Sequence, residues 1–331
     1  MGLRMAVDKY RRHQQTSHMS FPILGLHHVT ATVDDAQADL DFGIDALGMR
    51  LVKKTVNFDN RGVYHFYYGD ERGSPGTLWT TFPYKLLSVP QGTKGAGQVT
   101  VTSFSVPAGS LETWKKRLRE QGFTVTDAPP RFGEESVIVA DPSGLLIELV
   151  ATKGDTRTPW IAEGLDTTNA VRGIHSVTLT EANLAPTFKF MQDWFGFGTA
   201  DEMDGRMRVS VNGGGPGKSV DILTSPDGQR ARNGVGTVHH VAMAIGTDAE
   251  QLELRNALVK SGIQVTPVID RSYFHSIYFR EPGGVLFEVA TVEPGFMTDE
   301  SLDQLGLGLK LPPWEEVNRA DIEKHLPPVK Y

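Results

Sequence analysis

The sequence predicts an α+β protein assembled from four copies of one βαβββ module, and two observations support this prediction. A strand-like segment that opens with two adjacent histidines, residues 25–33, returns far downstream as residues 237–245. The turn and strand at residues 141–148 match residues 281–288 at a constant offset of 140 positions, the difference between 281 and 141. Such self-similarity indicates duplicated structural units.

Each module reads as a strand, a helix and three short strands. The helices are indicated by apolar residues at helical spacing and by terminal glycines such as Gly122 and Gly262. The strands are indicated by short β-branched runs between turn-forming residues. The modules begin near residues 24, 97, 173 and 237, their helices lie near residues 34–47, 110–122, 184–195 and 248–262, and their last strands end near residues 82, 149, 223 and 289.

The same offset relates modules one and two to modules three and four as duplicated domains. A polar stretch with Gly154, Pro159 and Gly164 is the natural linker between them. After residue 294 the chain ends in a Pro-rich tail, with a helical candidate at residues 315–325, that we expect to wrap the body. The predicted divisions are a polar N-terminal extension (1–20), an N-terminal domain (21–153), the linker (154–170), a C-terminal domain (171–294) and the tail (295–331).

Composition narrows the function classes. The 331 residues carry a formal net charge of −7. This charge does not indicate the positively charged surface that binds nucleic acid or an anionic membrane. No stretch approaches the roughly 18 uninterrupted apolar residues of a membrane-spanning helix. The lack of cysteine excludes disulfides and thiolate ligands, so any metal must be held by His, Asp or Glu, with Tyr a rarer ligand. We expect a cytoplasmic protein, and leave open whether it forms a homo-oligomer.

The two histidine pairs stand at the start of similar strands. Successive side chains of a strand alternate between its faces, so only one histidine of each pair is expected to point into a given cavity. In the second copy the small residue Ala242 shares a face with His240, and in the first copy Thr30 shares a face with His28. We therefore expect His28 and His240 to be the inward pair.

A carboxylate completes a candidate metal site. Glu288 lies on the last strand of module four and shares a face with the small residue Ala290. A buried carboxylate needs a partner, and a metal ion is one such partner. With His28 and His240 it gives the two imidazoles and one carboxylate of non-haem Fe(II) oxygenases with open coordination positions. We predict one metal ion per chain, between modules one and four, and leave the choice between iron and manganese open.

The repeat supplies an internal control for this site. At the offset of 140 positions His240 corresponds to Thr100, and Ser176 stands in module three where His28 stands in module one. Only Glu148 preserves the ligand set in the second copy. The second copy therefore lacks both imidazoles, and a second metal is not expected.

The four modules and this ligand set resemble the vicinal oxygen chelate superfamily. Within it, His-His-Val-Thr at 27–30, His-His-Val at 239–241 and Arg-Ser-Tyr-Phe-His-Ser-Ile-Tyr-Phe at 271–279 resemble the ring-cleaving dioxygenases of hydroquinones. The resemblance covers residues 24–294 and continues weakly into the tail. It implies two glyoxalase/extradiol-dioxygenase-like domains with cupped sheets. It also implies Fe(II), O2 and a hydroquinone- or catechol-like substrate.

The same resemblance assigns roles around the metal. His27, Thr30, His239, Arg271 and Tyr278 match positions that orient ligands or contact substrate. Tyr278, His239 and His27 are the candidates for the acid or base of the reaction, and Arg271 could stabilise an oxyanion.

The repeat also bears on these roles. Tyr278 corresponds to Ile138, which favours a function, whereas Arg271 corresponds to Arg131 in the copy without metal, which favours a structural role. We assign Thr30, Arg271 and His275 to substrate binding, although no spacing argument anchors His275.

Two other functions stay open. A glyoxalase-type lyase or isomerase could use Zn or Ni on the same scaffold, but such a site usually has a fourth protein ligand. Residues 78–81, on the closing strand of module one, contain neither a carboxylate nor a histidine. A non-catalytic module that binds an aromatic compound is the third possibility, and the metal triad counts against it.

Overall fold

The four predicted modules are present in the computed structural model of the chain, which describes residues 20–203, 205–225 and 227–331. The predicted extension at 1–20 falls outside the described residues except for its last position. Modules one and two comprise β1 (Ile23–Val33), α2 (Ala36–Leu40) with a helical turn at Asp41–Ala46, β2 (Arg50–Asn57), β3 (Asn60–Gly69), β4 (Leu78–Pro83), β5 (Gln98–Pro107), α3 (Leu111–Glu120), β6 (Val125–Asp127), β7 (Ser136–Ala140) and β8 (Leu146–Thr152). Modules three and four comprise β9 (Gly173–Glu181), α4 (Leu184–Phe195), β10 (Gly198–Met203), β11 (Arg206–Ser210), β12 (Ser219–Thr224), β13 (Thr237–Ile245), α5 (Asp248–Lys260), β14 (Ile269–Asp270), β15 (Phe274–Arg280) and β16 (Leu286–Pro294).

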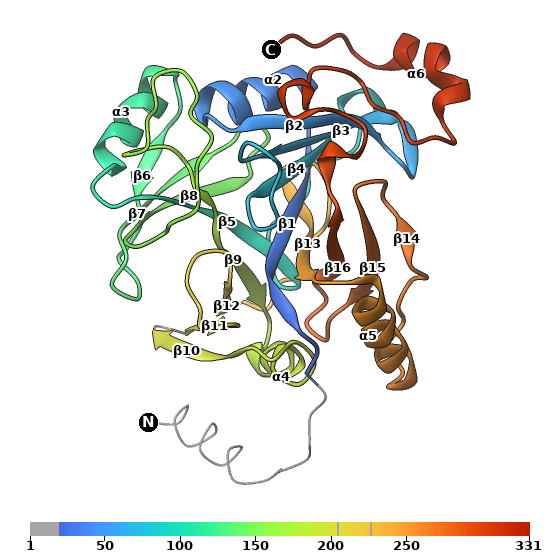
Figure 1. Cartoon of the computed structure of the whole chain (residues 1–331). Coiled ribbons are helices and arrows are strands. Elements are labelled where there is room, and N and C mark those ends of the chain that lie inside the picture. The colour runs from blue at the N-terminus through green and yellow to red at the C-terminus, as the bar shows by residue number, and fades with distance from the viewer. Residues whose placement is uncertain (1–19, 204, 226) are drawn as a thin grey trace.

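The strands form two curled 8-stranded sheets, which confirms the α+β class (Figure 1). The first sheet has the order β14-β15-β16-β13-β1-β4-β3-β2, and the second has the order β10-β11-β12-β9-β5-β8-β7-β6. The first sheet thus joins module one to module four through the antiparallel pair of β1 and β13. The second joins modules two and three through β5 and β9. Hydrogen-bonded sheets therefore combine modules from both sequence halves.

Apolar packing, in contrast, links modules of the same half. The ring of Phe190 in α4 lies 5.7 Å from Phe279 and 6.3 Å from Phe287, both in module four. Phe42 of module one lies 5.1 Å from Phe123 of module two. The division of the chain at residues 153 and 171 stays a prediction, because sheets and cores group the modules differently.

Helices cover one face of each sheet, here called the outer face. Leu254 and Leu258 of α5, for example, belong to the same buried core as Val241 and Met243 of β13. Helix α5 begins after Thr247, whose hydroxyl accepts the N–H of Glu250 and so caps a free donor. The opposite, inner face of the first sheet carries the candidate site.

The tail wraps the first sheet, as predicted. Buried Lys53 of β2 forms ion pairs with Asp299 and Glu300 of the tail, and Phe296 packs on the ring of Tyr67 at 5.1 Å. The expected helix near residues 315–325 is present as α6 (Arg319–His325), which follows a short helical turn. Within the described residues no helix is both long and apolar enough to cross a bilayer.

Candidate metal centre

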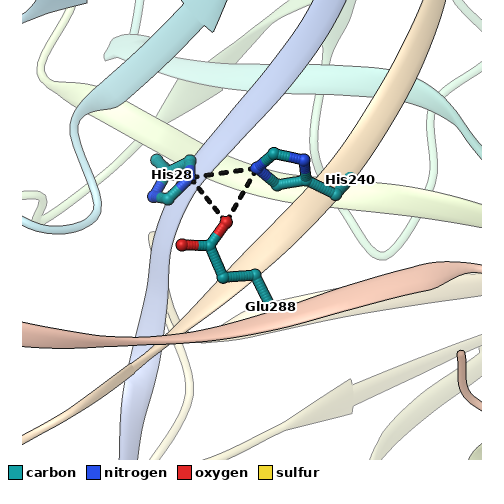
Figure 2. A group of neighbouring side chains, drawn as sticks. All are labelled: His28, His240 and Glu288. Atoms are coloured by element: carbon teal, nitrogen blue, oxygen red, sulfur yellow. Dashed lines mark hydrogen bonds and ion pairs between the residues drawn. The ribbon is translucent and has the colours of Figure 1, made fainter. Parts of the chain in front are cut away.

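Three buried side chains from three neighbouring strands meet on the inner face of the first sheet (Figure 2). Nε2 of His28 on β1 lies 3.2 Å from Nε2 of His240 on β13 and 3.2 Å from Oε2 of Glu288 on β16. Nε2 of His240 lies 2.8 Å from the same oxygen. No second group of His, Asp or Glu in the described part of the chain is placed to hold a metal in this way.

The separations fit a metal with ligands at right angles. Ligand atoms about 2.1 Å from a metal lie about 3.0 Å apart at right angles, but about 3.4 Å apart in a tetrahedron. The three observed separations are 2.8, 3.2 and 3.2 Å, and their mean of about 3.1 Å is nearer to the first value than to the second. The residues present therefore fit a metal that keeps coordination positions open.

The carboxylate of Glu288 also fits a cation. Its Oε1 accepts the hydroxyl of Ser276, whereas buried Oε2 faces Nε2 of His28 and Nε2 of His240, the two atoms that would share a metal with it. A buried carboxylate oxygen is unfavourable unless a cation or a hydrogen-bond donor faces it. Burial by itself raises the pKa of Glu288, but the neighbouring His28 and His240 outweigh this effect and hold it well below its ordinary value. The carboxylate is thus ionised and directed at the two histidines.

Strict alternation of side chains was the wrong expectation for the histidine pairs, because each pair contains a β-bulge. Leu26 and His28 oppose consecutive residues of β13, so His27 is an extra residue without a cross-strand partner. His239 is extra in the same way, between Val238 and His240. A bulge places two residues opposite one and re-aims their side chains. Both histidines of each pair consequently reach the inner face.

Ring contacts confirm that the bulged histidines face inward. His27 and His28 both pack on Phe274, at 4.9 and 5.3 Å between ring centroids. His239 packs edge-on to Phe82 at 6.0 Å. Phe274 and Phe82 lie on inner-face positions of β15 and β4, and so share the face of the sheet that carries the triad.

The bulged histidines are placed to select one tautomer of His28 and His240. When Nε2 of His28 binds a metal, its proton is on Nδ1, and this N–H can donate to Nδ1 of His27 at 2.9 Å. His240 has the same relation to Nδ1 of His239 at 2.8 Å. Burial and the nearby His28 lower the pKa of His27 to about 3, and desolvation lowers the pKa of His239 below its ordinary value although that residue is exposed to solvent. A lowered pKa favours the neutral imidazole, whose Nδ1 can accept a hydrogen bond.

Tyr278 and Arg271 lie beside the triad as one unit. The Tyr278 ring lies 5.6 Å from that of His240. Nε of Arg271 donates to the Tyr278 hydroxyl at 3.1 Å, and Nη2 donates to Asp59 at 3.1 Å. Burial and the Glu288 charge raise the pKa of Tyr278 despite the guanidinium. The phenol therefore keeps its proton, and its oxygen already has a donor.

The structure brings Thr30 to the site but not His275. Thr30 lies opposite His240 in the β1–β13 ladder and bonds to the hydroxyl of Thr80 at 2.7 Å. His275 points to the outer side instead, where its Nδ1 lies 2.7 Å from Asp248 at the start of α5. Alternation along β15 explains this placement, because Ser276 and not His275 meets Glu288.

Two residues of the site were missed from the sequence. Ser276 orients Glu288, and the repeat held a signal for it, because Ser136 likewise donates to Glu148 in the second sheet. His65 lies 3.0 Å from the Thr80 hydroxyl on the inner face. No spacing in the sequence indicated that contact.

In the second sheet an arginine occupies the equivalent of the metal position. Arg131 makes a two-point ion pair with Glu148 and donates to Asp221 at 3.2 Å. The ladders place Val101, and not Thr100, at the position of His240, because Val101 faces Thr178 as His240 faces Thr30. The sequence alignment was thus wrong by one residue. The second copy still lacks an imidazole at this position, because neither Thr100 nor Val101 has one.

Fold and site together define a glyoxalase-type protein with one candidate metal centre in its first sheet. The profile of the Glyoxalase/Bleomycin resistance protein/Dioxygenase superfamily matches residues 25–149 and again residues 173–289. The chain belongs to this superfamily, and the resemblance noted in the sequence is confirmed.

Several relatives match nearly the whole chain. MhqE of Bacillus subtilis, provisionally named a ring-cleaving dioxygenase, is 41% identical over 92% of this chain and 98% of its own. The chlorohydroquinone/hydroquinone 1,2-dioxygenase of Sphingobium indicum is 36% identical over 87% of this chain and 91% of its own. With such relatives the chain is an enzyme of the dioxygenase class.

Solved structures agree with the fold. A Bacillus subtilis protein provisionally described as a dioxygenase superimposes with a TM-score of 0.89 at 38% identity, over 94% of this chain and 99% of that chain. A glyoxalase I variant from Zea mays gives a TM-score of 0.60 at 16% identity, over 87% and 96% of the two chains. The second likeness concerns the fold alone.

Proposed function

We propose that this chain is an Fe(II)-dependent ring-cleaving dioxygenase that inserts both atoms of O2 into a hydroquinone- or catechol-like ring. The observation that carries the proposal is the convergence of His28, His240 and Glu288 at separations of 2.8–3.2 Å. Two imidazoles and one carboxylate with open positions are typical of non-haem Fe(II) oxygenases. The names of the relatives support the same reaction class. Mn(II) is the alternative metal.

The lack of a fourth ligand favours this function over a lyase or isomerase. On β4, Thr80 faces Thr30, at the position where the second sheet carries Asp221 opposite Thr178. Among the described residues no further His, Asp or Glu joins the triad. The site therefore suits a metal that must accept ligands from outside the protein.

Bound Fe(II) would supply affinity for a phenolate oxygen and the electron-transfer chemistry that O2 requires. The surrounding residues would bind and orient the ring. Tyr278 accepts the N–H of Arg271, so its own O–H is free to donate to a substrate oxygen. His239 uses Nδ1 as an acceptor for His240, which leaves its Nε2–H as a second donor. The Phe82 ring beside His239 offers an apolar wall for the substrate.

Oxygen uptake by reconstituted protein tests the proposal. Metal-stripped protein would be reloaded anaerobically with Fe(II), Mn(II) or Zn(II), and then given O2 and a hydroquinone or a catechol. We expect uptake with Fe(II) but not Zn(II), lost in His240→Ala and kept in His325→Ala, whose side chain is exposed on α6. Protein shown to hold one iron per chain that consumes no O2 with either substrate class would contradict the proposal. Full binding of the aromatic without metal would favour the non-catalytic alternative.

A further inference from the structure

A row of hydrogen bonds leads along the inner face of the first sheet away from the metal ligands. Thr30 of β1 bonds to Thr80 of β4 at 2.7 Å, and Thr80 lies 3.0 Å from Nε2 of His65 on β3. These strands are consecutive neighbours in the sheet. The row thus connects the strand of His28 with a histidine to which neither the sequence nor the proposed function gives a role.

The His65 ring is fixed, but it is not fully covered. It packs against Tyr67 at 4.0 Å and Phe82 at 4.3 Å between centroids, yet part of its surface stays open. Phe82 also contacts His239, so the two histidines flank one phenylalanine on the same wall. Within the described residues Nδ1 of His65 has no hydrogen-bond partner, whereas Nε2 is engaged by Thr80. One polar ring atom therefore remains for a ligand.

The second sheet shows what a purely structural residue does at this position. The ladders place Arg206 of β11 where β3 has His65, since Arg208 faces Asp221 as Tyr67 faces Thr80. Arg206 donates to Thr178 at 2.9 Å and to Asp221 at 3.1 Å. Both partners of Arg206 thus belong to the second sheet itself. In the first sheet, by contrast, Nδ1 of His65 has no partner among the described residues.

The separation of the strands indicates what His65 could reach. β1 and β3 are two strand spacings apart, which is about 10 Å along a sheet. In a ring with one oxygen at the triad, the para oxygen lies a full ring length from the first, and a ring directed along the sheet would carry it toward β3. An ortho oxygen would stay beside the first, at the triad itself.

We propose that His65 is a specificity-determining residue whose Nδ1 binds the substrate hydroxyl para to the oxygen held at the triad, so that the site selects 1,4-dihydroxylated rings. This inference rests on the proposed function and assigns its substrate class. Burial and the charges of His28, His240 and Arg271 lower the pKa of His65 well below its ordinary value, so the ring is neutral.

Three substitutions separate binding from packing. His65→Asn keeps an amide near the place of Nδ1 but loses the contact of Nε2 with Thr80. His65→Gln keeps an amide near the place of Nε2, and so the contact with Thr80, but has no polar atom at the place of Nδ1. His65→Phe loses both contacts and keeps an aromatic ring against Phe82. The probes are hydroquinone and phenol, which lacks the second hydroxyl. Their equilibrium binding to anaerobic Fe(II)-loaded protein would be measured alongside iron content and melting temperature.

We expect His65→Phe and His65→Gln to weaken hydroquinone binding about tenfold or more, the loss of one buried hydrogen bond. Phenol binding should change less than about twofold, His65→Asn should stay near wild type, and His325→Phe on α6 is the matched control. Equal weakening of both probes, or rescue by Gln and not by Asn, would overturn the inference. Failure of the proposed function would appear differently, as iron-loaded wild type without O2 uptake.

Discussion

Nδ1 of His27 and Nδ1 of His28 lie 2.9 Å apart although the residues are adjacent in sequence, because a β-bulge turns both rings to one face. His239 and His240 repeat the relation at 2.8 Å. A ligand histidine whose Nδ1–H has an acceptor presents Nε2 to the metal in a fixed orientation. Each tandem pair thus consists of one candidate ligand and the histidine that would orient it.

Replacing a supporting histidine should weaken metal binding without unfolding the protein. For His27→Phe we expect Fe(II) affinity to fall about 10–100-fold, because Nδ1 of His28 loses its acceptor while packing on Phe274 is kept. Competition with a chelator measures the affinity, with His325→Phe as control. Unchanged affinity would mean that His27 only packs.

The arginine of the second sheet should contribute stability and not metal chemistry. Arg131→Met leaves Glu148 buried without its cation, and we expect the free energy of unfolding to fall by about 3–5 kcal/mol. Arg131→Met combined with Glu148→Gln should recover part of the loss. Urea unfolding and metal analysis provide the two readouts. An unaltered stability, or a second metal bound in the single variant, would contradict this role.

Stability should decrease as the pH rises toward neutrality because of Asp39. Burial raises its pKa to about 7, although Tyr68 and Thr81 donate to Oδ2. The folded state therefore holds a proton that the unfolded state releases near its ordinary value of 3.8. The stabilisation is fully present below that value and is lost as the pH rises through the folded pKa.

The corresponding substitution is Asp39→Asn. Relative to wild type, it should gain about 2–4 kcal/mol in the free energy of unfolding between about pH 5 and about pH 8. Denaturant titrations at both pH values measure the gain. Asp45→Asn, an exposed carboxylate on the following helical turn, is the control. A pH-independent difference would show that Asp39 is ionised in the folded protein.

The tail should detach when its buried ion pair is broken. Lys53→Met leaves the carboxylates of Asp299 and Glu300 without their common cation, and should cost about 3–5 kcal/mol. Hydrogen exchange at residues 296–305 should increase, but not in Lys324→Met on α6. Equal protection in the two variants would show that apolar contacts such as that of Phe296 suffice.

The sequence predicted the modules because each one carries its own period of apolar residues and its own turn signals. The candidate ligands, which the structure brings together, were predicted from Glu288 and from the repeated histidines. The bulges at His27 and His239 could not be predicted, since they depend on how β1 and β13 align across more than two hundred residues. A bulge changes which face a side chain occupies without any local signal.

The positions of the remaining site residues depend on contacts between strands that are not evident from the sequence. His65 lies on a different strand from every ligand, and only the curled sheet brings it to Thr80. His275 shares a segment with Tyr278, but strand alternation directs it to Asp248. Ser276 was predictable in principle, because Ser136 precedes Glu148 by the same number of residues, 12, as Ser276 precedes Glu288.

The most direct test of the central claim is isotopic. Fe(II)-loaded protein would convert a hydroquinone under labelled O2, and mass spectrometry would follow the label in the product. We predict a ring-opened product that carries both labelled atoms, formed by wild type and absent with His240→Ala. O2 uptake that yields an unlabelled quinone would show that the centre oxidises the ring without cleaving it, and would contradict the assignment as a ring-cleaving dioxygenase.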